Sequence, residues 1–352
     1  MTVPAWQLNC PAAIDGNSDR ITLAHGEGAR LTRRLIDRHI RRRFRNDSLD
    51  CLPDAAHVTS PSGRIAVTTD SFVVSPLFFP GGDIGSLAVH GTVNDLAVSG
   101  ALPKWITLSM ILEEGLPMAV LERILDSVAA AAGECRVDVV AGDTKVVPRG
   151  AADGIFLTTT GIGELIDPVP IGPSSIQEGD VVLVSGPIGR HGVSVLCARE
   201  ELSFSPPPES DSAPLTDAVE RLRTSAGSGV RTIRDATRGG VSAVLHEWSA
   251  ACGLTFRLNE AQIPVTSDVR AVCELLGLDP LHIACEGTLV AAVAPEAATA
   301  AVESLRTLSV SKEAAVVGTV GPKSICPVTI QRSLGREQPV DEPSGSPLPR
   351  IC

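Results

Sequence analysis

Strand-like apolar runs alternate with helix-like segments along most of this chain, and this alternation constrains the fold more than any other feature. Residues 65–69, Ile-Ala-Val-Thr-Thr, have the composition of a buried strand, and residues 117–132 form a helical pattern that begins with proline, as helices favour. The alternation predicts an α/β or α+β layer structure in each half of the chain. The expected helices are 29–45, 85–100, 117–132, 217–224, 241–252 and 295–308, and the expected strands are 65–69, 104–112, 137–141, 154–163, 181–185, 288–294 and 315–320.

The chain is long enough for two domains. Its 352 residues exceed what a single hydrophobic core usually serves. A turn at residues 177–180, Gln-Glu-Gly-Asp, precedes a strand and opens the second half. We therefore expect an irregular lead-in (1–20), an N-terminal domain (21–170), a C-terminal domain (171–335) and a tail (336–352).

The tail differs in composition from the rest of the chain. Residues 338–349 are rich in proline, glycine and serine and contain few apolar side chains. Such a segment buries too little apolar surface to offset its ordering entropy, so we expect a flexible arm. The arm ends in Cys352. A mobile thiol is typical of a carrier that takes a group at one site and presents it at another; the alternative is a frayed tail that happens to end in cysteine.

Composition argues against several classes of protein. Aromatic residues make up 3% of the chain and tyrosine is absent, which disfavours a protein that stacks on bases, and the net charge of −11 disfavours binding to a phosphate backbone. The nine cysteines are widely spaced, without the paired spacing of zinc or iron–sulfur sites. No secretion signal or membrane-length apolar run is evident. We expect a cytoplasmic protein without nucleic-acid or membrane partners, in which Cys352 stays a free thiol.

Eight arginines crowd residues 29–45. The favoured interpretation is a solvated helix face whose side-chain stems pack along apolar surface. The alternative is a docking site for a phosphate-bearing ligand or an acidic partner.

Aspartates recur where predicted strands or glycine turns end, which is where α/β sheets bind ligands. Converging aspartates repel one another unless a cation lies among them, and Mg²⁺ that bridges nucleotide phosphates suits such a site. Each aspartate taken alone is more often a helix cap or a turn residue. The set consists of Asp54, Asp70, Asp83, Asp95, Asp143 and Asp235.

Two further residues fit such a site. Lys145 follows Asp143 by two positions and can offset charge during phosphoryl transfer. Glu286 precedes an apolar strand, so partial burial can make it a base. The chain has no Walker-type phosphate loop.

Six motifs, in the same order along the chain, closely resemble the HypE family, the carbamoyl dehydratases of [NiFe]-hydrogenase maturation. This family belongs to the superfamily of aminoimidazole ribonucleotide synthetase, selenophosphate synthetase and thiamine monophosphate kinase. The motifs are residues 23–28, 82–97, 142–150, 153–163 and 234–241, and the terminal Pro349-Arg350-Ile351-Cys352.

The resemblance implies a two-domain aminoimidazole-ribonucleotide-synthetase-like fold of the α/β (α+β) class with a flexible C-terminal tail. It makes residues 21–170 the ATP-binding domain and implies a homodimer, with ATP and Mg²⁺ as cofactors. The implied ATP-binding residues are Asp54, Asp70, Asp83, Asn94, Asp95, Asp143 and Thr144, and the implied Mg²⁺ ligands are Asp83, Asp95, Asp143 and Asp235.

The resemblance also implies the reaction. The carbamoyltransferase HypF loads a carbamoyl group onto Cys352, the arm folds back into the ATP site, and phosphorylation of the carbamoyl oxygen followed by loss of phosphate leaves S-cyanocysteine. The HypC–HypD complex then receives the cyanide for the hydrogenase iron. Cys352, Lys145 and Glu286 are the implied catalytic residues, because the reaction needs a base near the nitrogen and a cation near the phosphoryl group.

The chain departs from the family pattern at three places. Gly28-Ala29 stands where two glycines are common, His90 where cysteine is common, and residues 285–288, Cys-Glu-Gly-Thr, where Asn-Glu-Gly-Lys is common. Two other functions stay open at this point. One is a small-molecule ATP-dependent synthetase or kinase with an inert tail, and the other is a non-catalytic nucleotide-binding or scaffold protein.

Overall fold

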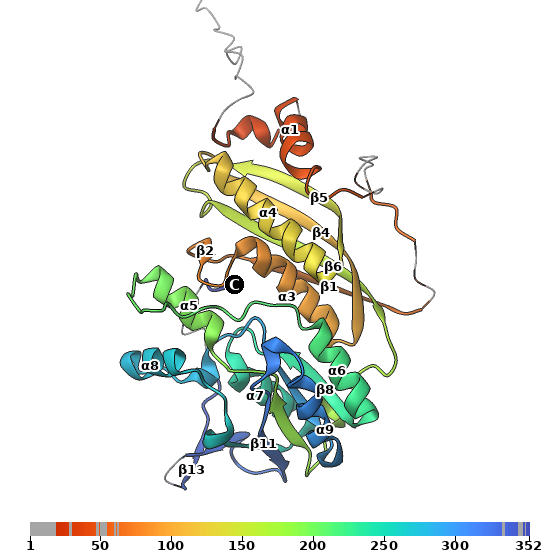
Figure 1. The fold of residues 1–352 in the computed structure, drawn as a ribbon, viewed down its shortest axis with the longest axis vertical. Helices are drawn as coiled ribbons and strands as arrows, with labels where there is room; N and C mark the ends of the chain where they lie inside the picture. The colour runs from red at the N-terminus through yellow and green to blue at the C-terminus, as the bar shows by residue number, and fades with distance from the viewer. Residues whose placement is uncertain are drawn as a thin grey trace, which may run out of the picture.

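The computed structural model describes residues 19–27, 30–46, 49, 55–59, 61, 63–332, 335–343, 348 and 350–352. These form two units, each built on one main sheet, with the C-terminus between them (Figure 1). The predicted two-domain α/β fold is therefore confirmed. The lead-in before residue 19 and Asp54 lie outside the described residues.

The N-terminal unit is a four-stranded sheet with helices on one face. Its strands lie in the order β1-β6-β4-β5, and α3 and α4 cover one side. The elements are η1 (Leu23–His25), α1 (Arg30–Leu35), the π-helix η2 (Ile36–Ile40), β1 (Ile65–Phe72), β2 (Phe78–Phe79), β3 (Gly82–Asp83), α3 (Ile84–Val98), β4 (Ala101–Glu113), α4 (Met118–Cys135), β5 (Asp138–Val147) and β6 (Ile155–Leu165).

The other face of this sheet is open in the single chain. Leu157 and Thr159 on β6 are buried beneath the helices, whereas their neighbour Thr158 is only half-buried. On β1, Ile65 and Val67 are 52% and 60% exposed. One face of the sheet is thus packed and the other faces solvent.

The C-terminal unit is a seven-stranded sheet in the order β13-β12-β9-β11-β7-β10-β8. Its elements are η3 (Pro173–Ser175), β7 (Val181–Val184), α5 (Arg190–Arg199), α6 (Thr216–Ala226), η4 (Gly227–Gly229), β8 (Val230–Asp235), α7 (Gly240–Cys252), β9 (Thr255–Asn259), η5 (Glu260–Gln262), α8 (Ser267–Leu276), η6 (Pro280–His282), β10 (Leu289–Val293), α9 (Pro295–Leu305), η7 (Ser309–Ser311), β11 (Ala315–Gly321), β12 (Val328–Gln331) and β13 (Glu337–Pro339).

The strand β10, which lies between β7 and β8, is buried on both faces, and this explains its uninterrupted apolar sequence. Val290 packs toward Trp248 of α7, whereas Leu289 packs with Leu222 of α6 and Leu305 of α9. Helices therefore cover both sides of this sheet.

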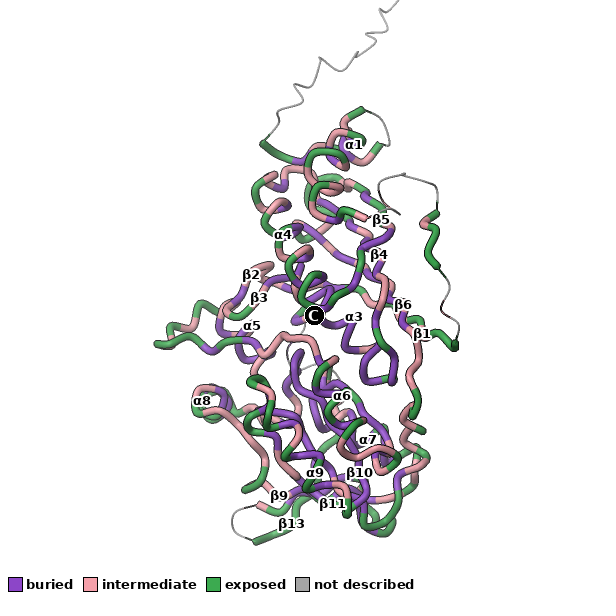
Figure 2. The backbone as a smooth tube through the Cα atoms, turned by 45° about the vertical axis from the view of Figure 1, so that its right-hand side comes forward, coloured by how far each residue is buried: buried purple, intermediate pink, exposed green. Residues whose placement is uncertain are grey.

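The two units share packing along α3, α5 and the tail. Val193 of α5 and Val269 of α8 belong to the same apolar cluster as the N-terminal core, and so do Leu348 and Ile351 of the tail. In Figure 2 the buried backbone runs along α3 and into the region around the C-terminus. The tail residues thus fill space between the units.

The structure differs from several sequence expectations. In the segment expected to be a helix over 29–45, the α-helix α1 passes directly into the π-helical turn η2, and the helical residues end at Ile40. The strands expected at 65–69 and 137–141 extend to Phe72 and Val147. Asp70 and Asp143 therefore lie within strands, not after them.

The tail boundary also differs. β13 pairs with β12, so the C-terminal sheet continues past residue 335 into the segment expected to be a flexible arm. Val340, Leu348 and Ile351 are buried. The mobility of the tail stays a prediction. Among the described residues, no helix is both long and apolar enough to cross a membrane.

Candidate active site

Backbone contacts fix the end of the tail between the two units. His191 Nε2 donates to the Ile351 carbonyl at 2.6 Å, and Arg199 Nη2 donates to the Arg350 carbonyl at 2.7 Å. The Ser75 amide also donates to the Arg350 carbonyl, at 3.2 Å. These donors recognise peptide oxygens near the C-terminus and hold the last residue in one place.

Cys352 is seated among acidic side chains. Burial raises the pKa of its thiol, Glu286 raises it further, and Asp70 and Asp235 act in the same direction, against Arg238. The seated thiol is therefore protonated at neutral pH. A thiol reacts with an electrophile as the thiolate. This buried position therefore does not suit a free thiol that must attack a group donor, but it does suit a sulfur to which a group is already attached.

The carboxyl groups around Cys352 form a cluster with one more member, and we call Asp70, Asp95, Asp235 and Glu286 the acidic cluster. Asp70 comes from β1, Asp95 from α3, Asp235 from the end of β8 and Glu286 from the segment before β10. Burial, followed by the charge of Asp95, raises the pKa of Asp235 to about 6. Thr68 Oγ1 donates to Asp95 Oδ2 at 2.8 Å and orients it.

Glu286 is the most unusual member of the cluster. It is 2% exposed, and its Oε1 has no hydrogen-bond partner among the described residues. Burial and then Asp235 and Asp211 raise its pKa well above the usual range for a carboxyl group. An unpaired buried polar atom lowers the stability of the fold by about 1–3 kcal/mol. Such a cost suggests that the group has a role other than stabilising the fold. A buried carboxyl group beside a thiol is therefore a candidate for chemistry.

The acidic cluster suits a divalent cation that is bound together with phosphates. Within the described residues, no three His, Cys, Asp or Glu side chains are arranged to hold an ion by themselves. Mg²⁺ with nucleotide phosphates usually needs only one or two protein carboxylates. Burial raises the pKa of Asp70 and Asp235 and the charge of Asp95 raises it further, so a cation would offset that repulsion.

A cleft of about 670 Å³ opens beside the acidic cluster, between the two units. Asp95 and Thr68 line it from the N-terminal unit, and Thr232, Arg234 and Trp248 line it from the C-terminal unit. Its volume lies in the range of small-molecule sites.

Asp83 lies far from this cleft. It is the N-cap of α3, and its Oδ1 accepts from the amides of Gly85 at 2.8 Å and Ser86 at 3.1 Å. Asp95 lies twelve residues later on the same helix, roughly 18 Å away at the α-helical rise. Asp83 and Asp95 of one chain cannot hold the same ion, so the expected four ligands do not form one site within a single chain.

Asp143 and Lys145 also lie apart from the acidic cluster. They are paired on β5, with Lys145 Nζ 3.2 Å from Asp143 Oδ2, and both side chains are exposed. Asp143 shares a cross-sheet row with Ser71, on the open face, whereas the neighbouring Asp70 faces the helices. The strands β1 and β5 are opposite edges, about 14 Å apart.

Two other predicted ATP-binding residues, Asn94 and Thr144, occupy buried positions within the fold. The Asn94 side-chain amide donates to the carbonyls of Ala213 and Glu286 and accepts from the Leu215 amide at 2.7 Å. These bonds use both N–H groups of the side-chain amide and favour a structural role between the units. Thr144 is buried on β5 beside a cavity of about 140 Å³.

Comparison with known proteins identifies the family. The models for AIR synthase related protein match residues 53–165 with their N-terminal domain and residues 177–330 with their C-terminal domain. Carbamoyl dehydratase HypE from Rhizobium leguminosarum bv. viciae is 45% identical over 339 residues, which are 96% of this chain and 97% of that protein. HypE from Escherichia coli K12 is 44% identical and covers 95% of this chain and 100% of its own length. The chain belongs to the HypE family.

Solved HypE structures share the fold. A crystal structure of HypE in complex with ATP matches with a TM-score of 0.89 and 42% identity, over 94% of this chain and 99% of the other. A HypE–HypF complex matches with a TM-score of 0.77 and 44% identity, over 88% and 99%. Thiamine monophosphate kinase from Aquifex aeolicus, at 20% identity and a TM-score of 0.59, shares the fold alone.

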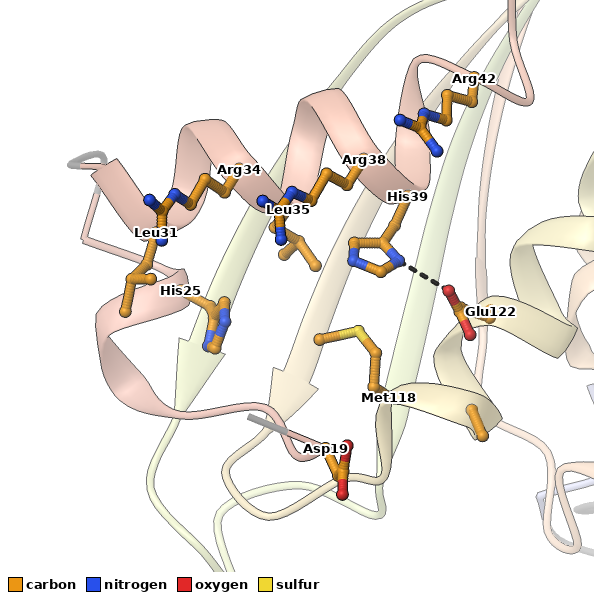
Figure 3. A pocket seen from close by; sticks show the side chains of 11 residues that line it. Asp19, His25, Leu31, Arg34, Leu35, Arg38, His39, Arg42, Met118 and Glu122 are labelled. Carbon is orange, nitrogen blue, oxygen red and sulfur yellow. Dashed lines mark hydrogen bonds and ion pairs between the residues drawn. The ribbon is translucent and has the colours of Figure 1, made fainter. Parts of the chain in front are cut away.

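A second cavity, of about 710 Å³, lies at the outer end of the N-terminal unit (Figure 3). We call it the arginine pocket, because Arg34, Arg38 and Arg42 project along one wall of it. His39 Nδ1 and Glu122 Oε1, 2.8 Å apart, connect that wall to α4. The arginine helix thus lines a real cavity, but one remote from Cys352.

Sequence reasoning missed several residues that hold the tail or the acidic cluster. Arg238 lies within a motif that carried the family resemblance, so a signal was present. His191, Arg199 and Asp211 had none. Asp211 falls in a proline- and serine-rich segment that resembles a surface loop, and only its long-range contacts show its role.

Proposed function

We propose that this HypE-family protein is a carbamoyl dehydratase that converts an S-carbamoyl group on its own Cys352 into S-cyanocysteine at the expense of ATP. The observation that carries the proposal is the position of Cys352, which we call its seat. Cys352 lies between the two units beside Glu286, and His191 and Arg199 hold the tail by its backbone carbonyls. An inert tail has no need of such a seat. The relatives named carbamoyl dehydratase support the same activity.

The chemistry follows from the groups at the seat. The carbamoyl oxygen attacks the γ-phosphorus of ATP and releases ADP, and the nitrogen loses one proton. Loss of the second proton and of phosphate, with its C–O bond, then leaves a carbon–nitrogen triple bond on sulfur. Glu286 accepts a proton from the nitrogen; its raised pKa makes its carboxylate a stronger base than an exposed one. Burial also keeps water from the phosphorylated group.

ATP occupies the cleft beside Asp95, with its phosphates toward the acidic cluster. Asp95 and Asp235, with Asp70, would hold Mg²⁺, which would neutralise charge on the phosphates. The HypE structure that contains ATP supports a nucleotide site in this family. Asp54 remains a candidate contact, and Asp83 caps a helix rather than joining this set.

A homodimer supplies the residues that one chain leaves apart. In the described residues, β1 and β5 each pair on one side only, and the sheet face between them exposes apolar side chains. Unpaired edges and an open apolar face favour association with a second copy. If β1 of one copy lies beside β5 of the other, the second copy brings the strand that carries Asp143 and Lys145 next to the strand that carries Asp70. Lys145 then offsets phosphoryl charge in the partner's site.

Partners act before and after this step. HypF loads the carbamoyl group, and the HypC–HypD complex receives the cyanide, both in the cytoplasm. The HypE–HypF complex in the family supports the first of these. Because Cys352 is half-buried and its thiol pKa is raised in the seat, the tail must leave the seat to be loaded and to deliver its product.

Intact-mass measurement tests the proposal. The protein is incubated with HypF, a carbamoyl donor and ATP, and a carbamoyl adduct followed by a cyano adduct is expected on the C-terminal peptide. The variant that lacks residues 348–352 separates the alternatives, because a small-molecule synthetase or kinase with an inert tail keeps its turnover. Loss of ATP turnover with the tail, together with the two adducts, supports the carbamoyl dehydratase.

A further inference from the structure

A chain of hydrogen bonds runs from the seated tail into the C-terminal unit. Its first member is His191, whose Nε2 lies 2.6 Å from the Ile351 carbonyl and whose Nδ1 lies 2.8 Å from Ser210 Oγ. Ser210 Oγ in turn accepts from the Ser212 amide at 3.0 Å. The ring of His191 is fully buried, so water does not replace these partners.

The docked tail determines which atoms in this chain of hydrogen bonds donate and which accept. A carbonyl oxygen can only accept, so His191 Nε2 carries the proton when Ile351 is in place. Burial lowers the pKa of His191, so the ring is neutral and its Nδ1 must accept. Ser210 therefore donates to Nδ1 and keeps a lone pair for the Ser212 amide. Without the tail, neither the tautomer nor the hydroxyl orientation is fixed by this contact.

Asp211, which lies between Ser210 and Ser212, forms hydrogen bonds with residues 286–288. Asp211 accepts from the amides of Glu286 and Gly287, each at 3.1 Å, and from Thr288 Oγ1 at 3.0 Å. A Cβ at Gly287 would lie 1.7 Å from the Asp211 carbonyl oxygen, so only glycine permits this approach. The position of the 210–212 segment thus sets the position of Glu286.

We propose that His191 is a positioning residue that couples the seating of the tail to the placement of Glu286. When Ile351 docks, His191 fixes Ser210, the 210–212 segment closes, and Asp211 holds the Glu286 backbone beside the sulfur. The base is then aligned only when the substrate group is present. This inference rests on the proposed function for its catalytic consequence, but not for the coupling itself.

Hydrogen exchange measures the coupling without any turnover. Truncation of residues 348–352 is expected to raise amide exchange in the peptide that covers residues 284–289 by about tenfold, because the grip of Asp211 loosens. Ser210→Ala is expected to raise it similarly while the tail is present. Ser194→Ala is the matched control, since it removes another buried hydroxyl, three residues from His191, that donates to the Pro80 carbonyl. Unchanged exchange in the truncated protein would overturn the proposal.

Two conservative variants break the chain at opposite ends. His191→Gln extends an amide toward the Ile351 carbonyl and is expected to keep Cys352 protected from alkylation. His191→Asn is too short to reach the tail and is expected to raise the alkylation rate about tenfold. Both are expected to slow single-turnover cyanation about tenfold. Ser210→Ala is expected to behave like His191→Gln, because its thiol should stay protected from alkylation while its cyanation is slow.

The pattern separates coupling from a general loss of structure. Cyanation at the wild-type rate in Ser210→Ala, or cyanation that falls only as far as thiol protection falls, contradicts the role assigned to His191. If wild-type protein forms no cyano adduct, the proposed function fails, and the exchange and alkylation results alone then decide the coupling.

Discussion

The acidic cluster and the arginine pocket have opposite charge and adjoin cavities of similar size, about 670 and 710 Å³. They differ in burial. Glu286 is 2% exposed and one of its oxygens has no hydrogen-bond partner in the part of the chain that the structure describes, whereas Arg38 and Arg42 are exposed. Charge held out of water is costly and changes pKa, while charge in water is cheap. Burial, rather than charge or cavity volume, therefore distinguishes the reactive region from the solvated one.

The largest expected effect is the loss of Cys352. Cys352→Ala should abolish both the carbamoyl and the cyano adduct, because the sulfur that carries the group is gone. Peptide mapping by mass spectrometry checks this. Cys135 and Cys273, whose pKa values burial raises to about 12 and about 11, are the matched controls and should tolerate substitution by serine or alanine without loss of adduct. A fully modified Cys352→Ala protein would remove the basis for treating the acidic cluster as reactive.

Glu286→Gln should come next in size. The change keeps the shape and removes the base, so single-turnover cyanation should fall about 100-fold or more. ATP binding, measured by calorimetry, should stay within a few-fold of wild type. Glu274→Gln, an exposed position on α8, is the control. Normal cyanation in Glu286→Gln would mean that its burial is a feature of packing alone.

Lys145 tests whether the site needs two chains. Cys352→Ala and Lys145→Ala should each be deficient, the second by about tenfold or more. Mixed in equal amounts and allowed to exchange subunits, they should recover about a quarter of wild-type cyanation, because half of the dimers then hold one complete site. If Lys145 acts within its own chain, no chain in the mixture is intact and activity does not return.

The pH dependence of protein stability should show the cost of burying the charge of Asp235. Its pKa, raised to about 6, means that the folded state binds more protons than the unfolded state between about pH 4 and 6. Wild-type stability without Mg²⁺ therefore falls as pH rises through this window, by on the order of 3 kcal/mol. Asp235→Asn lacks this loss, so its melting temperature should exceed that of wild type more at pH 8 than at pH 4. An equal difference at both pH values contradicts this.

The sequence predicted the fold class correctly, but it could not give the arrangement of the candidate site residues. Alternating apolar runs require layered sheets and helices, and the glycine–aspartate motifs marked Asp95, Asp235 and Glu286. It could not place Asp143 and Lys145 on the edge opposite β1, because periodicity gives the face of a residue but not the order of strands. It could not find His191 or Asp211 either, since their roles depend on contacts between residues distant in sequence.

The smallest effect is expected in the arginine pocket. Arg34, Arg38 and Arg42 lie about 6 Å apart along one helix face, on a wall open to solvent. Removing charge from water should change little, so Arg34→Ala/Arg38→Ala/Arg42→Ala should keep cyanation within about twofold of wild type.

Arg30→Ala/Arg33→Ala/Arg45→Ala changes the net charge equally on exposed positions outside the pocket and serves as the control. Both triples should behave alike if the arginines form a solvated face. A defect confined to the pocket triple in carbamoyl transfer from HypF, with intramolecular cyanation intact, would instead show that the pocket binds an acidic surface of that partner. That outcome would break the comparison, because it would show that exposed charge also carries function here, through recognition rather than through a shifted pKa.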